Sequence, residues 1–599
     1  MPAPEPARTP PHVDRRTLLI ASGTGLAAAG GAAAWLFGPG SDRASARAAT
    51  APTASVSVST PSTPSTATGA TTAAPTAPPV PSVPTTVGTT LHSVATPTGK
   101  GAYRRLADGP GWKRVVRADL APAHPGRADR RTAIAAFVQL TDLHVMDVQS
   151  PLRMEWMREH GPHDWRPHEA LSVLSTLSLI DRVNSLRGGP VTGHPLSFAI
   201  TTGDNTDNNS TIELDWFLSA MSGGRIDPNT GDPQAFEGIQ NSGLPLFWQP
   251  ESARTDADKK LGFPHLPGYL SAAMRPLTAP GLKIPWYSTV GNHDALFSGA
   301  YRSGPHGSFA GQIAVGDRKL EQVPHADMLR VYKAVNAQQD PDGTLVREVL
   351  QHYARTARTV TPDVRRAPFT PQEYLAAHLD PRRTGAGPVG HGYAAEGVDA
   401  DHMYYSFPVA DGVLGISLDT TDRGGSFLGS IGSEQLAWLG RTLAAHEDQH
   451  ILVFSHHAAH SMTNLRTDPA RPREKRHSGA ELTALLKKHP NVLAWINGHS
   501  HHNRIDPRGT FWEVNTASHV DYPQLGRVIE IVDNHDGTLS LITTLIESAA
   551  PHRTDFHDLS TAGLASLYRE LAFNAPGADI SSASGAAHDR NAELLLGKR

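Results

Sequence analysis

Five short motifs of polar residues in this sequence could bind metal ions. Each follows directly after a run of apolar residues, and its aspartate, histidine and asparagine side chains offer carboxylate, imidazole and amide ligands. Each motif taken alone is also compatible with an ordinary polar turn. Their shared position after five apolar runs is not expected by chance, and it predicts a centre for two metal ions. The motifs are Asp142-Leu143-His144, Gly203-Asp204-Asn205-Thr206-Asp207, Gly291-Asn292-His293-Asp294, Ser455-His456-His457 and Gly498-His499-Ser500-His501.

The third motif also holds residues that could transfer a proton. Asn292 could bind a metal through its carbonyl oxygen, while the neighbouring His293 could donate a proton. Asp294 is expected to hold the His293 ring and keep it charged. Together they predict a general acid beside the metal centre.

The five apolar runs that precede the motifs are the elements that must position them. Short apolar runs of this kind are typical of buried strands, and ligands in open α/β sheets gather at the carboxyl ends of the strands. We therefore expect the motifs to meet at one edge of a sheet. The runs are 134–140, 196–202, 284–290, 451–454 and 492–496.

In this order the five motifs resemble those of the calcineurin-like metallophosphoesterase superfamily, over about 135–503. The resemblance implies an α/β fold, a four-layer αββα sandwich of two mixed β-sheets with the metals at the strand ends. Two stretches exceed the family's minimal core, at about 208–283 and 295–403, and both leave from metal-binding loops. We expect them to cap the site and select the substrate, with solvent-facing decoration as the alternative.

The resemblance also implies a ligand set. His456 is taken in preference to His457 because it lies closer to the end of its strand, and Asp204 is expected to bridge the two ions. His293 matches the family's proton donor, with Asp294 as its orienter. The first metal is assigned to Asp142, His144, Asp204 and His501, and the second to Asp204, Asn292, His456 and His499.

These ligands indicate both the metals and the reaction. Hard and borderline ligands together suit two divalent or trivalent ions of Mn, Fe or Zn better than Mg alone. Asp207 stands where purple acid phosphatases have a tyrosine ligand, which removes the ferric-tyrosinate form of the site. Two such ions could clamp phosphoryl oxygens and acidify a bound water, so that a metal-bound hydroxide hydrolyses the ester.

The substrate class is left broad. The sequence predicts a hydrolase acting on a small phosphomonoester or phosphodiester, and the alternative is a non-catalytic exported metal- or phosphate-binding protein. A serine hydrolase would need G-x-S-x-G, and the nearest match, 498–502, ends in histidine. The formal net charge of −4 without a basic run argues against a nucleic-acid partner.

The N-terminal region predicts export. Arg15-Arg16 precede an Ala/Gly/Leu-rich stretch over 17–38 and then the small-residue pattern Ala44-Ser45-Ala46. Residues 1–48 therefore resemble a twin-arginine export signal that would carry the protein across the cytoplasmic membrane, to the cell envelope or outside. The alternative is an uncleaved membrane anchor, and we expect no other membrane contact.

Composition divides the remaining chain. Thr, Ser, Pro and Ala dominate 49–95, which predicts a disordered linker. The metal-binding domain is expected over 96–575, followed by a mobile polar tail over 576–599. Within the domain, the turn at 518–523 could line the site or be purely structural.

Overall fold

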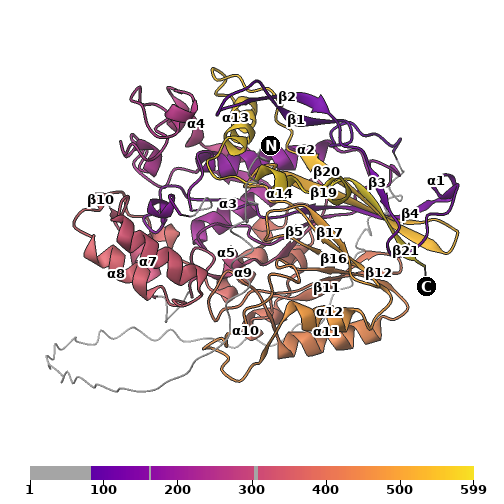
Figure 1. The fold of residues 1–599 in the computed structure, drawn as a ribbon. Helices are drawn as coiled ribbons and strands as arrows, with labels where there is room; N and C mark the ends of the chain where they lie inside the picture. The colour runs from indigo at the N-terminus through magenta and orange to yellow at the C-terminus, as the bar shows by residue number, and fades with distance from the viewer. Residues whose placement is uncertain (1–81, 161–163, 303–307, 599) are drawn as a thin grey trace, which may run out of the picture. The chain divides into compact units, whose positions relative to one another are not determined.

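The computed structural model describes residues 82–160, 164–302 and 308–598 (Figure 1). The predicted export signal and most of the predicted linker lie outside the described residues. All described residues belong to one compact unit, 77–599. Within them no helix has both the length and the apolar composition needed to cross a membrane.

A seven-stranded mixed sheet carries the first three motifs. β4, β5 and β8 are neighbours and run parallel, while β19 and β20 pair antiparallel beside β4. The three parallel strands end in buried residues on both faces, so their sequences do not alternate between buried and exposed residues there. In sheet order the strands are β3 (Val115–Arg117), β21 (Ala592–Gly597), β20 (Thr538–Glu547), β19 (Leu525–Asp533), β4 (Thr132–Leu140), β5 (Ala199–Thr202) and β8 (Trp286–Thr289).

A six-stranded mixed sheet carries the fourth and fifth motifs. β12, β14, β16 and β18 run parallel, with an antiparallel strand at each edge. Its inner face meets the first sheet through aromatic rings, including Phe137 of β4 and Phe454 of β14, whose centroids lie 5.8 Å apart. In sheet order the strands are β11 (Tyr405–Ala410), β12 (Val413–Ser417), β14 (His450–Phe454), β16 (Val492–Asn497), β18 (Trp512–Asn515) and β17 (Arg504–Pro507).

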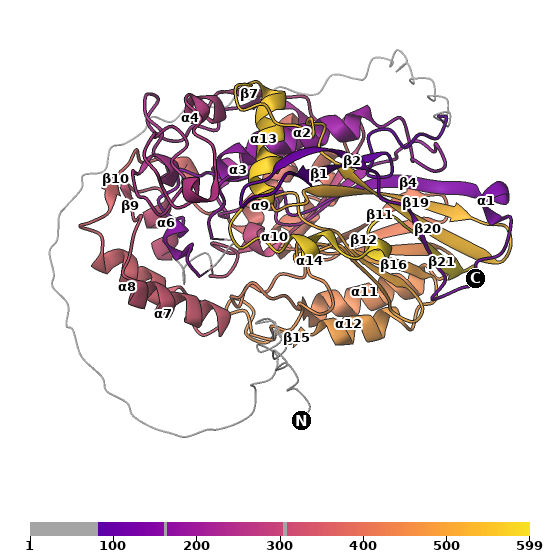
Figure 2. The ribbon, with the colours of Figure 1, turned by 45° about the horizontal axis from the view of Figure 1, so that its top comes forward.

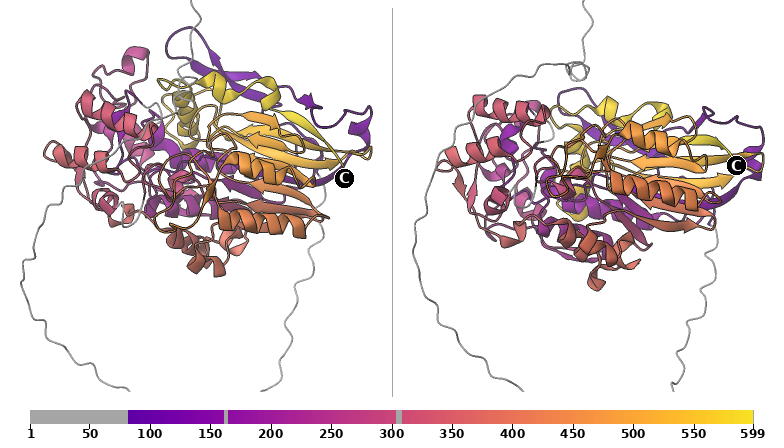
Figure 3. Two further views of the ribbon diagram at one scale, coloured as in Figure 1. Left: turned by 60° about the horizontal axis from the view of Figure 1, so that its bottom comes forward. Right: turned by 90° about the horizontal axis from the view of Figure 1, so that it is seen from below.

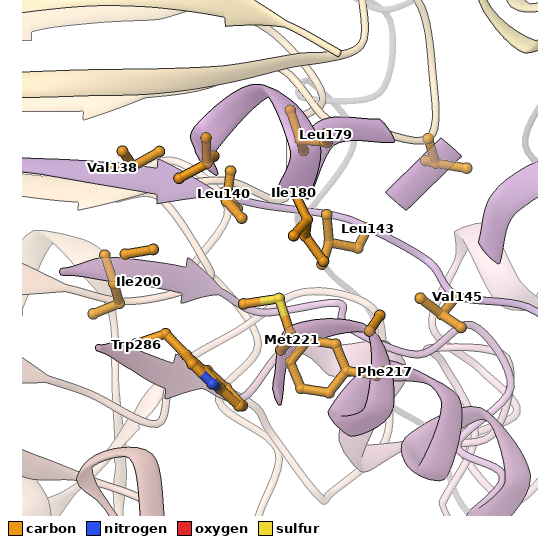
Figure 4. Packing of buried hydrophobic residues seen from close by; sticks show 14 of the residues in the cluster. Val138, Leu140, Leu143, Val145, Leu179, Ile180, Ile200, Phe217, Met221 and Trp286 are labelled. Atoms are coloured by element: carbon orange, nitrogen blue, oxygen red, sulfur yellow. The ribbon is translucent and has the colours of Figure 1, made fainter. Parts of the chain in front are cut away.

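Helices cover the outer face of each sheet (Figures 1 and 2). Leu439 and Leu482 lie in one buried cluster with Val453 and Trp495 of the six-stranded sheet. On the seven-stranded sheet, helix side chains such as Leu179 pack beside the strands (Figure 4). The expected α/β sandwich of two mixed sheets between helical layers is confirmed. Its outer helices are α11 (Ser433–Ala445) and α12 (Gly479–Leu486) on one side, and α2 (Ser172–Ser185), α3 (Thr211–Ser222) and α13 (Thr561–Phe573) on the other.

The two predicted insertions differ in what they build. The range 208–283 includes α3, whose Phe217 and Met221 pack against Trp286 of β8 in the core, so this part belongs to a helical layer and not to a cap (Figure 4). The remaining elements of both ranges gather beside one end of the two sheets (Figure 3). They are β6 (Gly224–Ile226), α4 (Tyr269–Ala273), β7 (Leu277–Ala279), α6 (Ser308–Ala314), β9 (Arg318–Lys319), α7 (His325–Asn336), α8 (Thr344–His352), β10 (Arg358–Thr359), α9 (Pro371–His378) and α10 (Glu396–Ala400). The short helix α5 (Asn292–Ala295) is formed by the third motif between the two ranges.

The ends of the domain differ from the expected boundaries. The predicted polar tail, 576–599, contains β21, which pairs with β20 and β3 and buries Leu594 and Leu596. At the other end, Thr90 lies inside the predicted linker, yet its hydroxyl donates a hydrogen bond to the backbone carbonyl of Leu545 in the folded domain. The folded part is therefore longer at both ends than composition indicated. The remaining elements are β1 (Ser93–Thr98), β2 (Arg105–Pro110), α1 (Arg127–Arg130), β13 (Ile431–Gly432), β15 (Arg476–His477) and α14 (Ile580–Ser584).

This correction predicts that the C-terminal strand contributes to stability. Leu594 is fully buried, so Leu594→Ala should lower the free energy of unfolding by about 2–5 kcal/mol. Val389 is 60% exposed, so Val389→Ala should change the free energy of unfolding by less than about 0.5 kcal/mol. Urea unfolding followed by circular dichroism measures both. Equal stabilities for the two variants would contradict the structural role of β21.

Candidate metal centre

All seven predicted metal ligands lie at the same ends of parallel strands. They follow β4, β5 and β8 in one sheet and β14 and β16 in the other, so the edges of both sheets contribute. The sharp turns after these strands place several ligands in the left-handed backbone region, which is uncommon for residues other than glycine. The φ angles are 51° at Asp142, 43° at His144, 51° at Asp204, 67° at His499 and 56° at His501.

The first predicted ligand group converges on a small volume. The possible ligand atoms of Asp142, His144 and His501 all lie within 4.8 Å of one another. His501 Nε2 is 3.3 Å from Asp142 Oδ1, and His144 Nε2 is 3.6 Å from Asp204 Oδ2. His144 Nε2 is buried without a hydrogen-bond partner among the described residues. A buried nitrogen aimed at carboxylate oxygens fits a metal ligand.

The second group converges in the same way. His456 Nε2 lies 2.9 Å from Asn292 Oδ1 and 3.2 Å from Asp204 Oδ2. His499 Nδ1 lies 3.1 Å from both Asn292 Oδ1 and His456 Nε2. Asp204 Oδ2 thus faces both groups, which fits the predicted bridging role.

His457 lies next to the second group but is held by other contacts. Its Nδ1 is 3.0 Å from the Thr420 hydroxyl, and its Nε2 is 3.1 Å from the carbonyl oxygen of Phe427. Its nitrogens are close enough to those of His456 and His499 to share an ion. The contacts nevertheless favour the sequence-based choice of His456.

Three histidines are oriented through the nitrogen that faces away from the centre. The Nδ1 atom of His456 lies 2.9 Å from the carbonyl oxygen of Thr202, so it must carry the hydrogen. The corresponding atom of His144 lies 2.9 Å from Asp207 Oδ1, and that of His501 lies 2.7 Å from Asp521 Oδ2. Each ring therefore presents Nε2 to the centre, the arrangement in which metal-binding histidines are held.

His293 lies beside the centre with a fixed tautomer. Its Nδ1 is 2.6 Å from the backbone carbonyl oxygen of Asp207, and a carbonyl only accepts. Nδ1 therefore carries a hydrogen, and Nε2 is the atom that can exchange a proton. The backbone N–H of His293 donates to Asp204 Oδ1 at 2.8 Å, which ties it to the bridging carboxylate.

The prediction that Asp294 orients the His293 ring is wrong. The Asp294 carboxylate instead accepts hydrogen bonds from the backbone N–H groups of Gly291, Asn205 and Thr206, at 2.9, 3.2 and 2.9 Å. Burial, followed by the charge of Asp204, raises the pKa of Asp294 to about 6. Asp294 therefore holds the second and third motifs together.

The charges of the centre balance one another without metal. Burial alone would lower the pKa of His456 and His501, but Asp204 raises that of His456 to about 9 and Asp142 raises that of His501 to about 10. In return, burial would raise the pKa of Asp204, yet His456 and His293 hold it well below its usual value. The buried carboxylates therefore favour the protonated form of both imidazoles.

A small cavity borders His293 and Asp207. Its volume is about 90 Å³, and the predicted second insertion supplies Ser298, Ala300, Tyr301 and Val335 to its wall. Among the described lining residues, the predicted first insertion supplies only Asn208. The segment after the first motif, which the sequence analysis did not single out, contributes Arg153, Met154, Met157 and Asp164.

Sequence reasoning also missed the residues behind the ligands. Asp521 lies in the turn that was left open between a site role and a structural role, and it contacts His501. Arg153 and Arg166 bind Asp207 and Asp521, and neither belongs to a motif. A buried arginine has no local pattern, so only the fold could reveal these contacts.

Comparisons with known proteins bear on the fold alone. No protein-family model and no curated protein matches this chain. Similar solved structures include a dimetal phosphatase from Danio rerio, with a TM-score of 0.34, 11% identity, and coverage of 70% of this chain and 100% of that one. A putative 5'-nucleotidase from Staphylococcus aureus has a TM-score of 0.26, 12% identity, and coverage of 69% and 54%. GAP50, the anchor in the inner membrane complex of Plasmodium, has a TM-score of 0.25, 9% identity, and coverage of 76% and 100%. At these values, function has to be argued from the residues of this chain.

The packing around Asp204 predicts that Gly291 cannot carry a side chain. A Cβ atom there would lie 2.2 Å from the backbone nitrogen of Asp204 and 2.3 Å from its Oδ1. Gly291→Ala should therefore displace the shared carboxylate and reduce the metal retained after dialysis, measured by elemental analysis. Gly597→Ala is the control because its Cβ would meet nothing within 4 Å. Retention of the same metal content by both folded variants would contradict the site.

The charge balance predicts that metal binding releases protons. The pKa values of His456 and His501 are about 9 and 10, so at pH 8 each ring of the metal-free protein carries a second proton, on Nε2, in addition to the one on Nδ1. Metal must displace the second proton of each ring, so apparent affinity should rise with pH through this range, by up to about tenfold per unit for each proton. Titration calorimetry at pH 8 in buffers of different ionisation enthalpy should give different apparent heats. Heats that do not depend on the buffer would contradict proton release.

Proposed function

We propose that the protein is an exported hydrolase that uses two metal ions to cleave a small phosphomonoester or phosphodiester. The decisive support is that the two ligand groups overlap at one carboxylate, that of Asp204, which is 3.6 Å from His144 Nε2 and 3.2 Å from His456 Nε2. Dinuclear hydrolytic sites need such a shared ligand, because their ions lie about 3.5–4 Å apart. The export part of the proposal depends on the sequence of residues 1–48 alone.

Each metal ion has a complete set of candidate ligands. When bound, the ions would supply positive charge to phosphoryl oxygens and acidify a water molecule. The mixture of imidazole, carboxylate and amide donors suits Mn, Fe or Zn. One ion would be held by Asp142, His144, Asp204 and His501, and the other by Asp204, Asn292, His456 and His499.

In this proposal His293 delivers a proton to the leaving oxygen. Its Nδ1–H is held by the backbone carbonyl of Asp207 at 2.6 Å, so the ring cannot turn without breaking that bond. The protonated ring would donate from Nε2 as the ester oxygen departs. The side chain is 24% exposed, which keeps it accessible to substrate and able to regain its proton from solvent.

In this proposal the cavity beside His293 receives the leaving group. Its volume of about 90 Å³ is that of a small substituent. Its walls combine apolar groups of Met154 and Met157 with the polar Asn208 and Tyr301. We propose that these residues, of which Tyr301 belongs to the second insertion, contribute to substrate choice.

The proposal is tested by hydrolysis of p-nitrophenyl phosphate, bis-p-nitrophenyl phosphate and β-glycerophosphate with Mn, Zn or Mg and with a chelator control. Asp204→Ala should abolish metal-dependent turnover of all three. His293→Ala should slow β-glycerophosphate by about 10²–10⁴-fold and the p-nitrophenyl esters less, because p-nitrophenolate leaves without a proton. His557→Ala is the control, since His557 is 98% exposed.

The outcomes separate the alternatives. Turnover that requires metal and Asp204 supports the enzyme, and the preferred ester distinguishes monoesterase from diesterase. Two bound metal ions without turnover of any ester would favour a metal- or phosphate-binding protein. A protein that binds no metal would refute the proposed centre.

A further inference from the structure

Two buried arginines extend from the first ligand group into the protein. Arg153 donates from Nη1 to Asp207 Oδ2 at 2.7 Å, while Asp207 Oδ1 accepts from His144 Nδ1 at 2.9 Å. The two carboxylate oxygens are therefore divided between the arginine and the histidine. Asp207 cannot turn towards either partner without losing the other. The Arg153 side chain is only 4% exposed, so water does not replace it.

Arg166 repeats this arrangement at the other histidine of the same group. Its Nε and Nη2 donate to Asp521 Oδ1 and Oδ2 at 2.7 and 3.1 Å, a two-point contact that fixes the plane of the carboxylate. Asp521 Oδ2 also accepts from His501 Nδ1 at 2.7 Å. Both imidazoles that accompany Asp142 are thus held through an arginine and a carboxylate.

Glu169 connects the two arrangements. Its Oε2 accepts from Arg153 Nη2 at 2.7 Å and from the backbone N–H of Arg166 at 3.0 Å. The neighbouring His168 contacts the carbonyl oxygen of Val520 at 2.8 Å through Nε2. This contact links residues 166–169 to the turn that carries Asp521. Arg153 and the residues 166–169 therefore hold both histidines.

The second ligand group is supported differently. His456 is held by the backbone carbonyl of Thr202, which follows from the path of β5 and needs no charged side chain. A carboxylate behind an imidazole makes it a stronger metal ligand and fixes its direction, and loss of such support typically costs about 10–100-fold in metal affinity. The charged support is concentrated on the group of Asp142, His144 and His501.

We propose that Arg153 and Arg166 are positioning residues for this first metal group. They act through Asp207 and Asp521, and they set the direction in which His144 and His501 present Nε2. This inference rests on the proposed metal centre, but it does not depend on which ester is hydrolysed. It assigns a role to a segment that lies outside all five motifs.

The test is cobalt binding to the metal-stripped full-length protein, followed by visible absorption and by elemental analysis. In Arg153→Met and in Arg166→Met, one of two cobalt equivalents should bind about 10–100-fold more weakly and its absorption bands should shift. The other equivalent should stay within about threefold of the wild type. Arg166→Lys restores the charge but not the two-point contact, so it should give an intermediate affinity.

Arg158→Met is the matched control. Arg158 follows Arg153 by five residues and is bound to a buried carboxylate, with Nη1 2.8 Å from Asp258 Oδ2, but within the described part of the chain neither member of this pair contacts a histidine ligand. Both cobalt equivalents should bind to this variant as to the wild type. If removal of Arg153 alone prevents folding by leaving buried carboxylates unpaired, the double variant Arg153→Met/Glu169→Gln removes one charge of each sign.

The outcomes distinguish this inference from the proposed function. Folded arginine variants with wild-type cobalt affinities and spectra would overturn the positioning role, and so would an equal loss in Arg158→Met. Two tightly bound cobalt ions without hydrolysis of any ester would reject the phosphoesterase and leave the positioning role standing. Binding of fewer than two cobalt ions by the wild type would overturn both.

Discussion

The site depends on the fixed position of one carboxylate, that of Asp204. Its Oδ2 faces both ligand groups, and its Oδ1 accepts the backbone N–H of His293 at 2.8 Å. A Cβ on Gly203 would lie 2.7 Å from His456 Nδ1 and 2.8 Å from Gly291, so the loops after β5, β8 and β14 are packed to contact. The glycines of the motifs are required because no side chain fits between the loops that bring the ligands together.

This placement puts several charges in a buried volume, which has a large cost unless each is paired. The protein meets that requirement in successive layers. Imidazole groups lie against Asp142 and Asp204, the carboxylates of Asp207 and Asp521 lie behind two of those imidazoles, and arginines lie behind the carboxylates. Each layer has the sign that stabilises the previous one, so the centre and its surroundings form one electrostatic unit.

Much of this could be predicted from sequence, for a local reason. The ligands directly follow apolar runs, and the edge where parallel strands end brings such residues together. Contacts made by packing were not predictable: Arg166 and Asp521 are distant in the chain, and β21 is a short apolar run that is buried by its partner strands. The role of Asp294 was misassigned because 292–295 forms a helical turn, α5, in which consecutive side chains point about 100° apart. Because His293 and Asp294 are consecutive residues of this helical turn, the Asp294 side chain points away from the His293 ring.

The second insertion does more than border the cavity. Its helix α9 supplies Tyr374, whose hydroxyl lies 3.2 Å from Asn205 Nδ2 and 3.0 Å from the Ser288 hydroxyl. Asn205 in turn donates to Asp294, which joins the loops of the second and third motifs. The region that supplies the cavity wall through Tyr301 thus also supports the loops of the metal centre. The second insertion therefore has two structural roles: one part of it borders the cavity, and another part, α9, holds the Asn205 side chain that joins the ligand-bearing loops. A substitution in α9 that displaces Tyr374 removes a contact of Asn205, whereas a substitution at Tyr301 alters the cavity wall without touching that contact.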